Sequence, residues 1–317
     1  MDGTMESPQA DTLERMQIDW EDAACPLCAA SNADALIEAA DPLPGPDIRF
    51  RFLIVRCRDC GLAYTNPRPS PRSIGQFYPE DYLPHQYRGS AASRQKWGLW
   101  LRRDSLVPVL PLPPGGRLLD FGCGGGDLLQ EMHERGWRVT GLDPSPDVVG
   151  YIREQLGLPA FVGTLPHPEL RPGSFEAITM SQSLEHVHEP LQVLREAHRL
   201  LVRGGRIAIT VPNIDSLPFR WFGADWFGLD VPRHLTHFSP PTLQRMLIAA
   251  GFQVGGVQFI RHNSWLRHSA SLAARHSGKS SLWRRLMRIR VVASLAGWYS
   301  AARRKANCIL AVGIKTR

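Results

Sequence analysis

The stretch "LLDFGCGGGDLL", residues 118–129, decides the fold, because a glycine-rich turn in it joins an apolar segment to an amphipathic one. Residues 117–121 predict a strand, a helix is expected from about Leu128, and residues 138–142 predict a second strand that ends at Asp143. Together these elements are typical of the first half of a nucleotide-binding βαβ unit. Dehydrogenases use G-x-G-x-x-G, whereas Asp127 stands here in place of the last glycine, so this turn is of another kind.

Residues 120–126, "DFGCGGG", resemble the D/E-x-G-x-G-x-G motif of class I S-adenosylmethionine-dependent methyltransferases. Small residues let backbone N–H groups approach a ligand closely, and an acidic residue 21 positions after Gly122, here Asp143, can hold both hydroxyls of a ribose. Packing of a tight strand-to-helix connection is the alternative reason for the glycines.

The rest of the chain supports the resemblance, because further segments follow in the family's order. Residues 175–180 predict a strand, residues 190–201 a helix, Gly204-Gly205 a turn and residues 206–211 a strand. The segment "DVPRHLTHFSPPTLQRMLIAAGF" resembles one branch of the family, so the likeness covers roughly residues 115–260. It implies a doubly wound α/β fold with a mainly parallel seven-stranded sheet, whose sixth strand is residues 252–259 and whose antiparallel seventh is residues 308–315.

The resemblance also assigns roles around the cofactor. Gly122 and Gly124 should line its methionine and ribose part, Asp120 should lie near its amino end, and Asp143 should bind the ribose. The other residues expected at the cofactor are Cys123 in the turn, Pro144, Thr164 and Leu165 around the adenine, and Ser181 and Gln182 at the methionine end. The family often has an acidic residue near the adenine, and "VGTLPH" lacks one. No NPPY-type tetrapeptide follows the fourth strand, which argues against methylation of amino groups on nucleobases or glutamine.

Methyl transfer from a sulfonium is an in-line displacement, so alignment and in some cases one general base carry the catalysis. Histidine is the candidate base because its pKa lies near neutrality; the candidates are His186, His234 and His237, each of which could instead be structural. Alternatively, "QSLEH" resembles the E-x-x-E-H divalent-metal motif of some relatives. Gln182 would then replace the first glutamate, Glu185 and His186 would follow, and His237 or His234 would supply a further ligand.

Four of the six cysteines form two C-x-x-C pairs, Cys25/Cys28 and Cys57/Cys60, with 28 residues between the pairs. This arrangement predicts a structural zinc site; a redox role would need only one pair. Similar zinc modules precede the catalytic domain in some sugar and small-molecule methyltransferases. We expect a disordered acidic tail over residues 1–20, a zinc-ribbon-like module over 21–90, a linker at "VLPLPPGG" and a methyltransferase domain over 91–317. Cys123 and Cys308 are predicted to be buried thiols.

The net charge of +7 is unevenly distributed, because residues 262–317 hold 12 Lys or Arg and no Asp or Glu, which leaves −5 on the rest. A basic insertion at about 261–306 predicts two helices separated at Ser277-Gly278. It could form a lid over the active site, or lie on an anionic membrane with Trp283 and Trp298 as anchors. No apolar run is long enough for a membrane span and no secretory signal is recognisable, so we expect a cytoplasmic protein.

The predicted function is S-adenosylmethionine-dependent methylation of a hydroxyl on a small-molecule or saccharide-type metabolite. The predicted cofactors are S-adenosylmethionine, structural zinc and, in the alternative mechanism, a divalent cation at the active site. An RNA methyltransferase is the alternative, with the zinc module and the basic insertion as RNA grips; the acidic character of residues 23–47 counts against nucleic acid. A cofactor-free binding protein of the same fold is disfavoured by the intact glycine turn. No pattern in the sequence predicts an oligomeric state.

Overall fold

The computed structural model describes residues 18–43, 50–78, 115–277 and 282–316. The predicted acidic tail up to residue 17, the predicted domain boundary at residues 90–91, and the predicted linker up to residue 114 lie outside the described residues.

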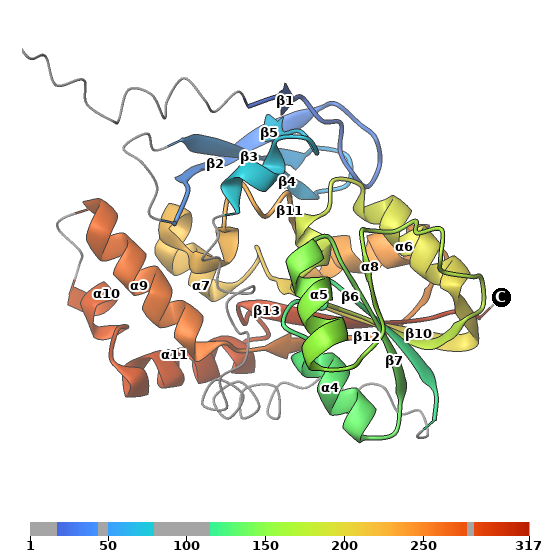
Figure 1. Ribbon diagram of the computed structural model, residues 1–317. Coiled ribbons are helices and arrows are strands. Elements are labelled where there is room, and N and C mark those ends of the chain that lie inside the picture. The colour runs from blue at the N-terminus through green and yellow to red at the C-terminus, as the bar shows by residue number, and fades with distance from the viewer. Residues whose placement is uncertain (1–17, 44–49, 79–114, 278–281, 317) are drawn as a thin grey trace, which may run out of the picture.

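A seven-stranded sheet forms the centre of the molecule (Figure 1). Its strand order is β12-β13-β10-β9-β6-β7-β8, and only β13 runs antiparallel to its neighbours. The predicted doubly wound, mainly parallel sheet is therefore confirmed. The strands are β6 (Arg117–Phe121), β7 (Arg138–Asp143), β8 (Ala160–Val162), β9 (Phe175–Ser181), β10 (Leu201–Pro212), β12 (Gln253–Ile260) and β13 (Cys308–Ile314).

Helices cover both faces of this sheet because neighbouring side chains in each strand point to opposite sides. In β6, Leu118 packs with α4 (Asp127–Glu134) and α5 (Pro146–Gln155), while Leu119 packs with α6 (Pro190–Leu200) and α8 (Pro240–Ala249). The sheet is thus buried on both faces, and its functional edge is the one where the parallel strands end.

The predicted turn at Gly204-Gly205 is wrong, since both glycines lie inside β10. Gly204 has a positive φ of 80°, and the pairing of β10 with β9 shifts register between Leu201 and Arg206. The glycine pair therefore forms an irregularity within one long strand. In sequence alone, such an irregularity looks the same as a glycine turn.

The N-terminal module, which we define as residues 18–43 and 50–78, shares a sheet with a strand from the later part of the chain. The four-stranded sheet has the order β11-β4-β3-β2, and β11 (Thr236–His237) pairs antiparallel with β4 through Thr236–Tyr64 and His237–Ala63. The module's other elements are β1 (Trp20–Glu21), β2 (Ala33–Ala40), β3 (Arg51–Cys57), β4 (Ala63–Thr65), β5 (Arg68–Pro69), which pairs with β1, and η1 (Ile74–Phe77).

A buried arginine holds the two parts together. Arg233 is 0% exposed, and its guanidinium contacts Asp41 Oδ1 at 2.6 Å and Asp230 Oδ1 at 2.7 Å. It also donates to the carbonyl of Phe77 at 2.9 Å. Burial alone would raise the pKa of Asp230, yet the charge of Arg233 keeps that pKa below its usual value. Arg233 therefore has partners in the N-terminal module, namely Asp41 and Phe77, and one in its own part of the chain, Asp230.

The basic insertion forms three helices, α9 (Asn263–Ser277), α10 (Leu282–Leu286) and α11 (Arg290–Ala302). The predicted second helix is wrong in being continuous, because Ile289 adopts an extended conformation (φ −76°, ψ 128°) before α11. Leu266 and Ala270 of α9 join a core cluster with residues of α7 (Leu217–Phe222), η4 (Gly223–Asp225), η5 (Phe227–Leu229) and β2. No helix in the described ranges is long and apolar enough to cross a membrane.

Replacing Arg233 by methionine should lower the free energy of unfolding by about 3–5 kcal/mol, because Asp41 and Asp230 would lose the buried guanidinium that balances their charges. Urea denaturation followed by circular dichroism measures the change. The matched control is Arg220→Met, since Arg220 pairs with Asp215 at an exposed position and its loss should cost less than about 1 kcal/mol. Equal effects of the two substitutions would contradict a structural role for Arg233.

Candidate active site

The glycine turn after β6 is sterically fixed. Gly122 has a φ of +70°, and its N–H donates to the carbonyl of Leu142 at 2.7 Å. A Cβ atom on Gly122 would lie 2.5 Å from Cβ of Ser183, and one on Gly126 would lie 2.7 Å from Cδ1 of Leu156. Both positions thus require glycine, for the backbone angle and for the close contact.

Asp143, the last residue of β7, is 5% exposed and faces this turn. Its Oδ2 accepts from the N–H of Gly124 at 3.0 Å, and its Oδ1 accepts from the N–H of Ser145 at 3.0 Å. The carboxylate therefore joins the glycine turn to the start of α5, at the sheet edge where ligands of such folds bind.

Asp120 lies beneath the turn and is almost completely buried. It accepts a hydrogen bond from the hydroxyl of Thr179 in β9 at 2.7 Å. Burial raises its pKa to about 7, and the nearby charge of Asp143 adds to the effect. A positively charged amino group beside Asp120 would favour the ionised carboxylate, which fits the predicted position near the amino end of the cofactor.

The other residues predicted at the cofactor lie around the same edge. Gly163 donates its N–H to the carbonyl of Asp143 at 2.9 Å, which brings the following Thr164 and Leu165 close to the end of β7. Pro144 and Thr164 are exposed, whereas Leu165 is 3% exposed and belongs to the core. Contact of these three residues with adenine remains a prediction.

The segment after β9 begins with Ser181 and Gln182, which contact β10. The hydroxyls of Ser181 and Thr210 are 3.2 Å apart. Gln182 has a positive φ of 52°, and its amide nitrogen donates to Thr210 Oγ1 at 3.4 Å and to Cys308 Sγ at 3.2 Å. The side chain of Gln182 is thus held by β10 and β13.

The two cysteines outside the C-x-x-C pairs are buried, as predicted. Cys308 is 0% exposed and its thiol donates to the carbonyl of Val211 at 3.0 Å. Cys123 is 7% exposed, and a Cβ on Gly141 would lie 2.8 Å from its sulfur. Burial raises the pKa of Cys123 well above its usual value, so its thiol stays protonated. Cys123 therefore packs below the turn, and a direct contact with the cofactor remains a prediction.

A second group of polar residues, the Glu–His cluster, consists of Glu185, His186 and His234. Each offers one ligand atom, and these atoms lie within 4.8 Å of one another. Glu185 is 0% exposed, and among the described residues neither of its carboxylate oxygens has a hydrogen-bond partner. Burial raises its pKa to about 8. A buried carboxyl group without a hydrogen-bond donor lowers the stability of the fold. Such a group is therefore expected to be protonated or to bind a cation or a ligand.

The hydrogen bonds of His234 determine its tautomer. Its Nδ1 lies 3.0 Å from the carbonyl of Gly228, which can only accept, so Nδ1 carries the hydrogen and Nε2 carries the lone pair. Nε2 lies 4.0 Å from Glu185 Oε1 and 3.9 Å from Asp230 Oδ2. Burial lowers the pKa of His234 to about 4, so the ring is neutral near pH 7. The lone pair of Nε2 therefore faces two carboxyl groups across a short gap, and the carboxyl group of Glu185, with its raised pKa, is protonated near pH 7.

His186 lies next to His234, with ring centroids 4.6 Å apart. Its Nδ1 is 3.1 Å from the carbonyl of Arg233 and 3.0 Å from the hydroxyl of Tyr78. Burial lowers its pKa to about 3, so this imidazole is also neutral near pH 7. Two neutral rings and one carboxyl group thus share a single buried place.

His237 lies outside this cluster, in β11. Its Nε2 is 3.1 Å from the hydroxyl of Thr65 in β4, and burial lowers its pKa to about 3. The structure therefore brings together three of the four residues predicted for catalysis, with His234 as the histidine of the "PRHLTHF" segment that joins them. A catalytic part for His237 remains a prediction, because its ring is not among the ligand atoms that come together in the cluster.

Ser183 connects the cluster to the glycine turn. Its Cβ lies 2.5 Å from the place where a Cβ on Gly122 would fall, and its buried hydroxyl has no hydrogen-bond partner in the described part of the chain. The 3₁₀ turn η3 (Leu184–His186), which carries Glu185, follows it directly. The cluster thus begins two residues after Ser183, which lies against the turn, and four residues after the end of the central strand β9.

Sequence reasoning missed four residues around this site: Ser183, Tyr78, Asp230 and Arg233. Ser183 and Arg233 belong to the segments "QSLEH" and "PRHL", in which only the glutamate, glutamine and histidine side chains were predicted to have a role. Tyr78 reaches His186 from a position 108 residues away, a contact that local sequence patterns do not signal.

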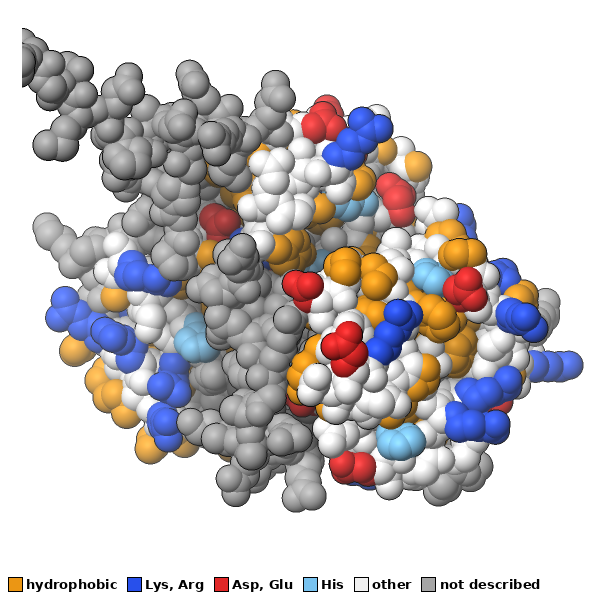
Figure 2. Space-filling model, in the orientation of Figure 1, with side chains coloured by type: hydrophobic (Ala, Val, Ile, Leu, Met, Phe, Trp, Pro, Cys, Tyr) orange, Lys and Arg blue, Asp and Glu red, His pale blue; other side chains and the backbone are white. Residues whose placement is uncertain are grey.

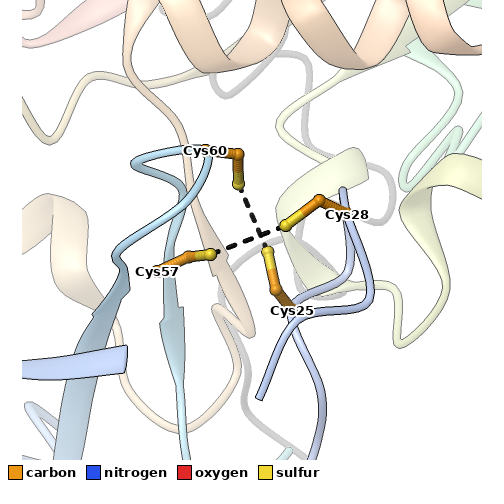
Figure 3. Close-up of side chains that lie close together, drawn as sticks. All are labelled: Cys25, Cys28, Cys57 and Cys60. Atoms are coloured by element: carbon orange, nitrogen blue, oxygen red, sulfur yellow. Dashed lines mark hydrogen bonds between the residues drawn. The ribbon is translucent and has the colours of Figure 1, made fainter. Parts of the chain in front are cut away.

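The four cysteines of the C-x-x-C pairs converge on one point (Figure 3). The sulfurs of Cys25 and Cys60 are 3.4 Å apart, and those of Cys28 and Cys57 are 3.6 Å apart. All four lie within 4.8 Å of one another, although they come from two loops. Burial raises the pKa of Cys25 to about 11, and backbone N–H groups of Leu27 and Cys28 hydrogen-bond to its sulfur. Four sulfurs at such distances fit a tetrahedral metal ion.

The fold and the edge site define the class: a seven-stranded doubly wound sheet with a glycine turn after its first strand and an acidic residue at the end of the second is a class I methyltransferase. Residues 94–255 match the family described as "Methyltransferase domain". The chain belongs to this family and is an S-adenosylmethionine-dependent methyltransferase.

Two relatives are each similar over about half of the chain. The ubiquinone biosynthesis O-methyltransferase of Xanthomonas axonopodis pv. citri (strain 306) is 31% identical over 175 residues, which are 51% of this chain and 73% of the relative. That of Xanthomonas oryzae pv. oryzae (strain PXO99A) is 32% identical over 174 residues, covering 51% and 72%. A solved complex between the Haloferax volcanii Trm112 methyltransferase activator and a methyltransferase contains a similar chain, with a TM-score of 0.52 and 17% identity, over 72% of this chain and 95% of that one. The last likeness bears on the fold alone.

Proposed function

We propose that this methyltransferase methylates a hydroxyl group of a small molecule, and that the hydroxyl binds at the Glu–His cluster. The observation that carries the proposal is the buried carboxyl of Glu185, which lacks a donor, faces Nε2 of His234, and lies two residues from Ser183 at the glycine turn. The names of the two relatives, both O-methyltransferases, support oxygen as the acceptor atom. A saccharide-type acceptor is included, because its reacting group is also a hydroxyl.

The cofactor supplies an electrophilic methyl group on a sulfonium. Gly122 and Gly124 would leave room for the cofactor, Asp143 would hold its ribose hydroxyls, and Asp120 would interact with its amino group. Burial of Glu185 and His234 excludes water from the acceptor, so that their acceptor atoms orient its O–H. His234 takes the proton at Nε2, because its Nδ1 already carries a hydrogen bonded to Gly228.

The alternative mechanism places a divalent cation in the same cluster, where it would bind the acceptor oxygen and favour loss of its proton. A carboxylate and two neutral imidazoles are suitable ligands. Gln182 stands where the resemblance expects a further carboxylate, and its amide is engaged by Thr210 and Cys308. Asp230, with Oδ2 3.9 Å from His234 Nε2, places a second carboxylate beside the cluster.

We also propose that Cys25, Cys28, Cys57 and Cys60 hold one structural zinc ion. Their sulfurs form a compact set in which a bound cation would favour thiolates over buried thiols. One cysteine pair lies in the loop before β2, and the other lies at the end of β3 and in the loop after it. β4 begins two residues after Gly61. The zinc would therefore hold the strand that pairs with β11.

The Asp143→Ala variant should bind S-adenosylmethionine at least about tenfold more weakly, because two charge-assisted hydrogen bonds to the ribose are lost. Isothermal titration calorimetry measures the affinity, and circular dichroism checks that the fold persists. Glu154→Ala, which removes an exposed carboxylate from α5, is the control and should change nothing. Unchanged affinity of the Asp143 variant would exclude a role at the cofactor.

The Glu185→Gln and His234→Gln variants should lower the turnover number by about a hundredfold or more, because His234 takes the acceptor's proton only in the transition state and Glu185 orients the acceptor's O–H for that transfer. The assay follows tritiated methyl groups into hydroxyl-bearing metabolites, and calorimetry should show unchanged cofactor affinity. Glu189→Gln, an exposed carboxylate three residues after His186, is the control. Activity abolished by EDTA and restored by magnesium or manganese would select the cation mechanism. Full activity in both variants would refute both mechanisms.

Elemental analysis of the purified protein should find about one zinc per chain. The Cys57→Ser variant should lose the metal and melt at a lower temperature, because the ion contributes to folding. Cys308→Ser, at a buried cysteine outside the four-sulfur group, should keep the zinc. A metal-free wild-type protein, or a Cys57 variant with unchanged zinc and melting temperature, would contradict the site.

A further inference from the structure

Helix α11 has an apolar side that faces solvent. Val291, Leu295, Trp298 and Tyr299 lie one or two turns apart on that side, and we call them the apolar stripe; their exposed fractions are 67, 64, 58 and 54%. Most other exposed large hydrophobic side chains in the described ranges lie close by in the chain, namely Leu282, Trp283, Leu286 and Ile289. Surface helices normally turn such a side toward the core.

The inner side of α11 explains why the stripe cannot turn inward. Ala293, Gly297 and Ser300 are buried on this side, and α11 packs against α9. A Cβ on Gly297 would lie 2.2 Å from Asn263 Oδ1, so the two helices approach closely. The small residues therefore fix the orientation of α11, and the exposed stripe is part of the folded structure.

Basic residues surround the apolar stripe. Arg288 and Arg290 precede it, Arg303 and Arg304 follow it, and all four are exposed. On the left of Figure 2, where Figure 1 places α9 to α11, Lys and Arg side chains crowd together with hydrophobic ones. The sequence has no acidic residue from His262 to Arg317. The surface thus combines an apolar centre with a positively charged rim.

Two aromatic residues of the stripe lie beside arginines. The guanidinium of Arg261 is 3.6 Å from the ring centroid of Trp298, and that of Arg303 is 5.9 Å from the ring of Tyr299. Tryptophan and tyrosine favour the boundary between lipid headgroups and acyl chains, and arginine binds phosphate groups well. Arg284, in contrast, pairs with Asp225 at 3.7 Å and belongs to the contact with the protein body.

We propose that the apolar stripe of α11 and its arginine rim bind the surface of a membrane that contains anionic lipids. The helix of 13 residues, about 20 Å long, would lie in the plane of the interface, with its apolar side chains below the headgroups. The arginines would contact lipid phosphates and keep their charges at the surface. The inference concerns a surface remote in sequence from the acceptor cluster and is independent of the acceptor's identity.

A second copy of this chain fits the surface less well. A symmetric dimer would bring the same patch of both copies together, so the arginine rim of one copy would face the arginine rim of the other. Without acidic residues in this region, these charges would repel one another across a desolvated contact. An anionic lipid surface supplies the opposite charge together with an apolar phase.

Flotation of the full-length protein with vesicles tests the proposal. Wild-type protein should bind vesicles of phosphatidylcholine with phosphatidylglycerol, bind those of phosphatidylcholine alone much less, and lose affinity as salt rises. Replacing Leu295 and Trp298 together by serine, or Arg288 and Arg290 together by glutamine, should weaken binding by about tenfold or more. Cofactor affinity serves as the folding control for each variant.

The matched control variants are Ile248→Ser, an exposed apolar residue of α8, and Arg135→Gln, an exposed arginine after α4. Both should bind vesicles as wild type does. Absent binding to anionic vesicles, or equal binding by the stripe and control variants, would overturn the proposal. Analytical ultracentrifugation would also overturn it by showing a wild-type dimer that the Leu295/Trp298 replacement dissociates, since the stripe would then be covered by a second copy.

Discussion

The buried guanidinium of Arg233 is the interaction on which the arrangement of the site depends. It forms ion pairs with Asp41, just after β2, and with Asp230, which precedes Arg233 by three residues. It also donates a hydrogen bond to the carbonyl of Phe77. Next to Arg233, His234 enters the Glu–His cluster, and the N–H of Leu235 donates to the carbonyl of Glu185 at 2.8 Å. Thr65 in turn donates its N–H to the carbonyl of Leu235 at 3.0 Å. One short segment is therefore held between the N-terminal module and the central sheet, and it carries the ring that faces Glu185.

The central fold could be predicted because its signals are local. The strand-turn-helix around Gly122 and the two C-x-x-C pairs are readable over short windows, and the structure has the expected sheet and sulfur cluster. The pairing of β11 with β4 could not be predicted, since a strand of two residues has no periodicity and its partner lies 172 residues away. The same pairing takes His237 to Thr65 while His234 turns to Glu185, so two histidines three residues apart have different surroundings. The break at Ile289 was missed because the packing of Ala293 and Gly297 on α9, and not local propensity, sets where α11 begins.

The residues proposed to bind the cofactor and the acceptor, or to lie beside them, include buried polar groups that are unfavourable for the stability of the fold. Glu185 and Ser183 bury oxygen atoms without partners, although buried polar groups are normally hydrogen-bonded. Asp120 is buried close to another carboxylate, and its pKa is raised to about 7. Such groups lower the stability of the protein without ligands and gain partners when ligands bind. Arg233 differs from these groups, because its buried charge has partners in the protein itself.

The basic insertion is connected to the acceptor cluster by a short series of contacts. The hydroxyl of Ser269 in α9 accepts from the N–H of Phe227 at 2.9 Å, which fixes the start of η5. The next residue, Gly228, supplies the carbonyl that sets the tautomer of His234. Because α11 packs on α9, the helix that carries the apolar stripe supports the loop that determines which nitrogen of His234 faces Glu185. The insertion therefore holds the carbonyl of Gly228 in place beside His234. These contacts already fix the orientation of His234, so a membrane bound at α11 would not need to change it.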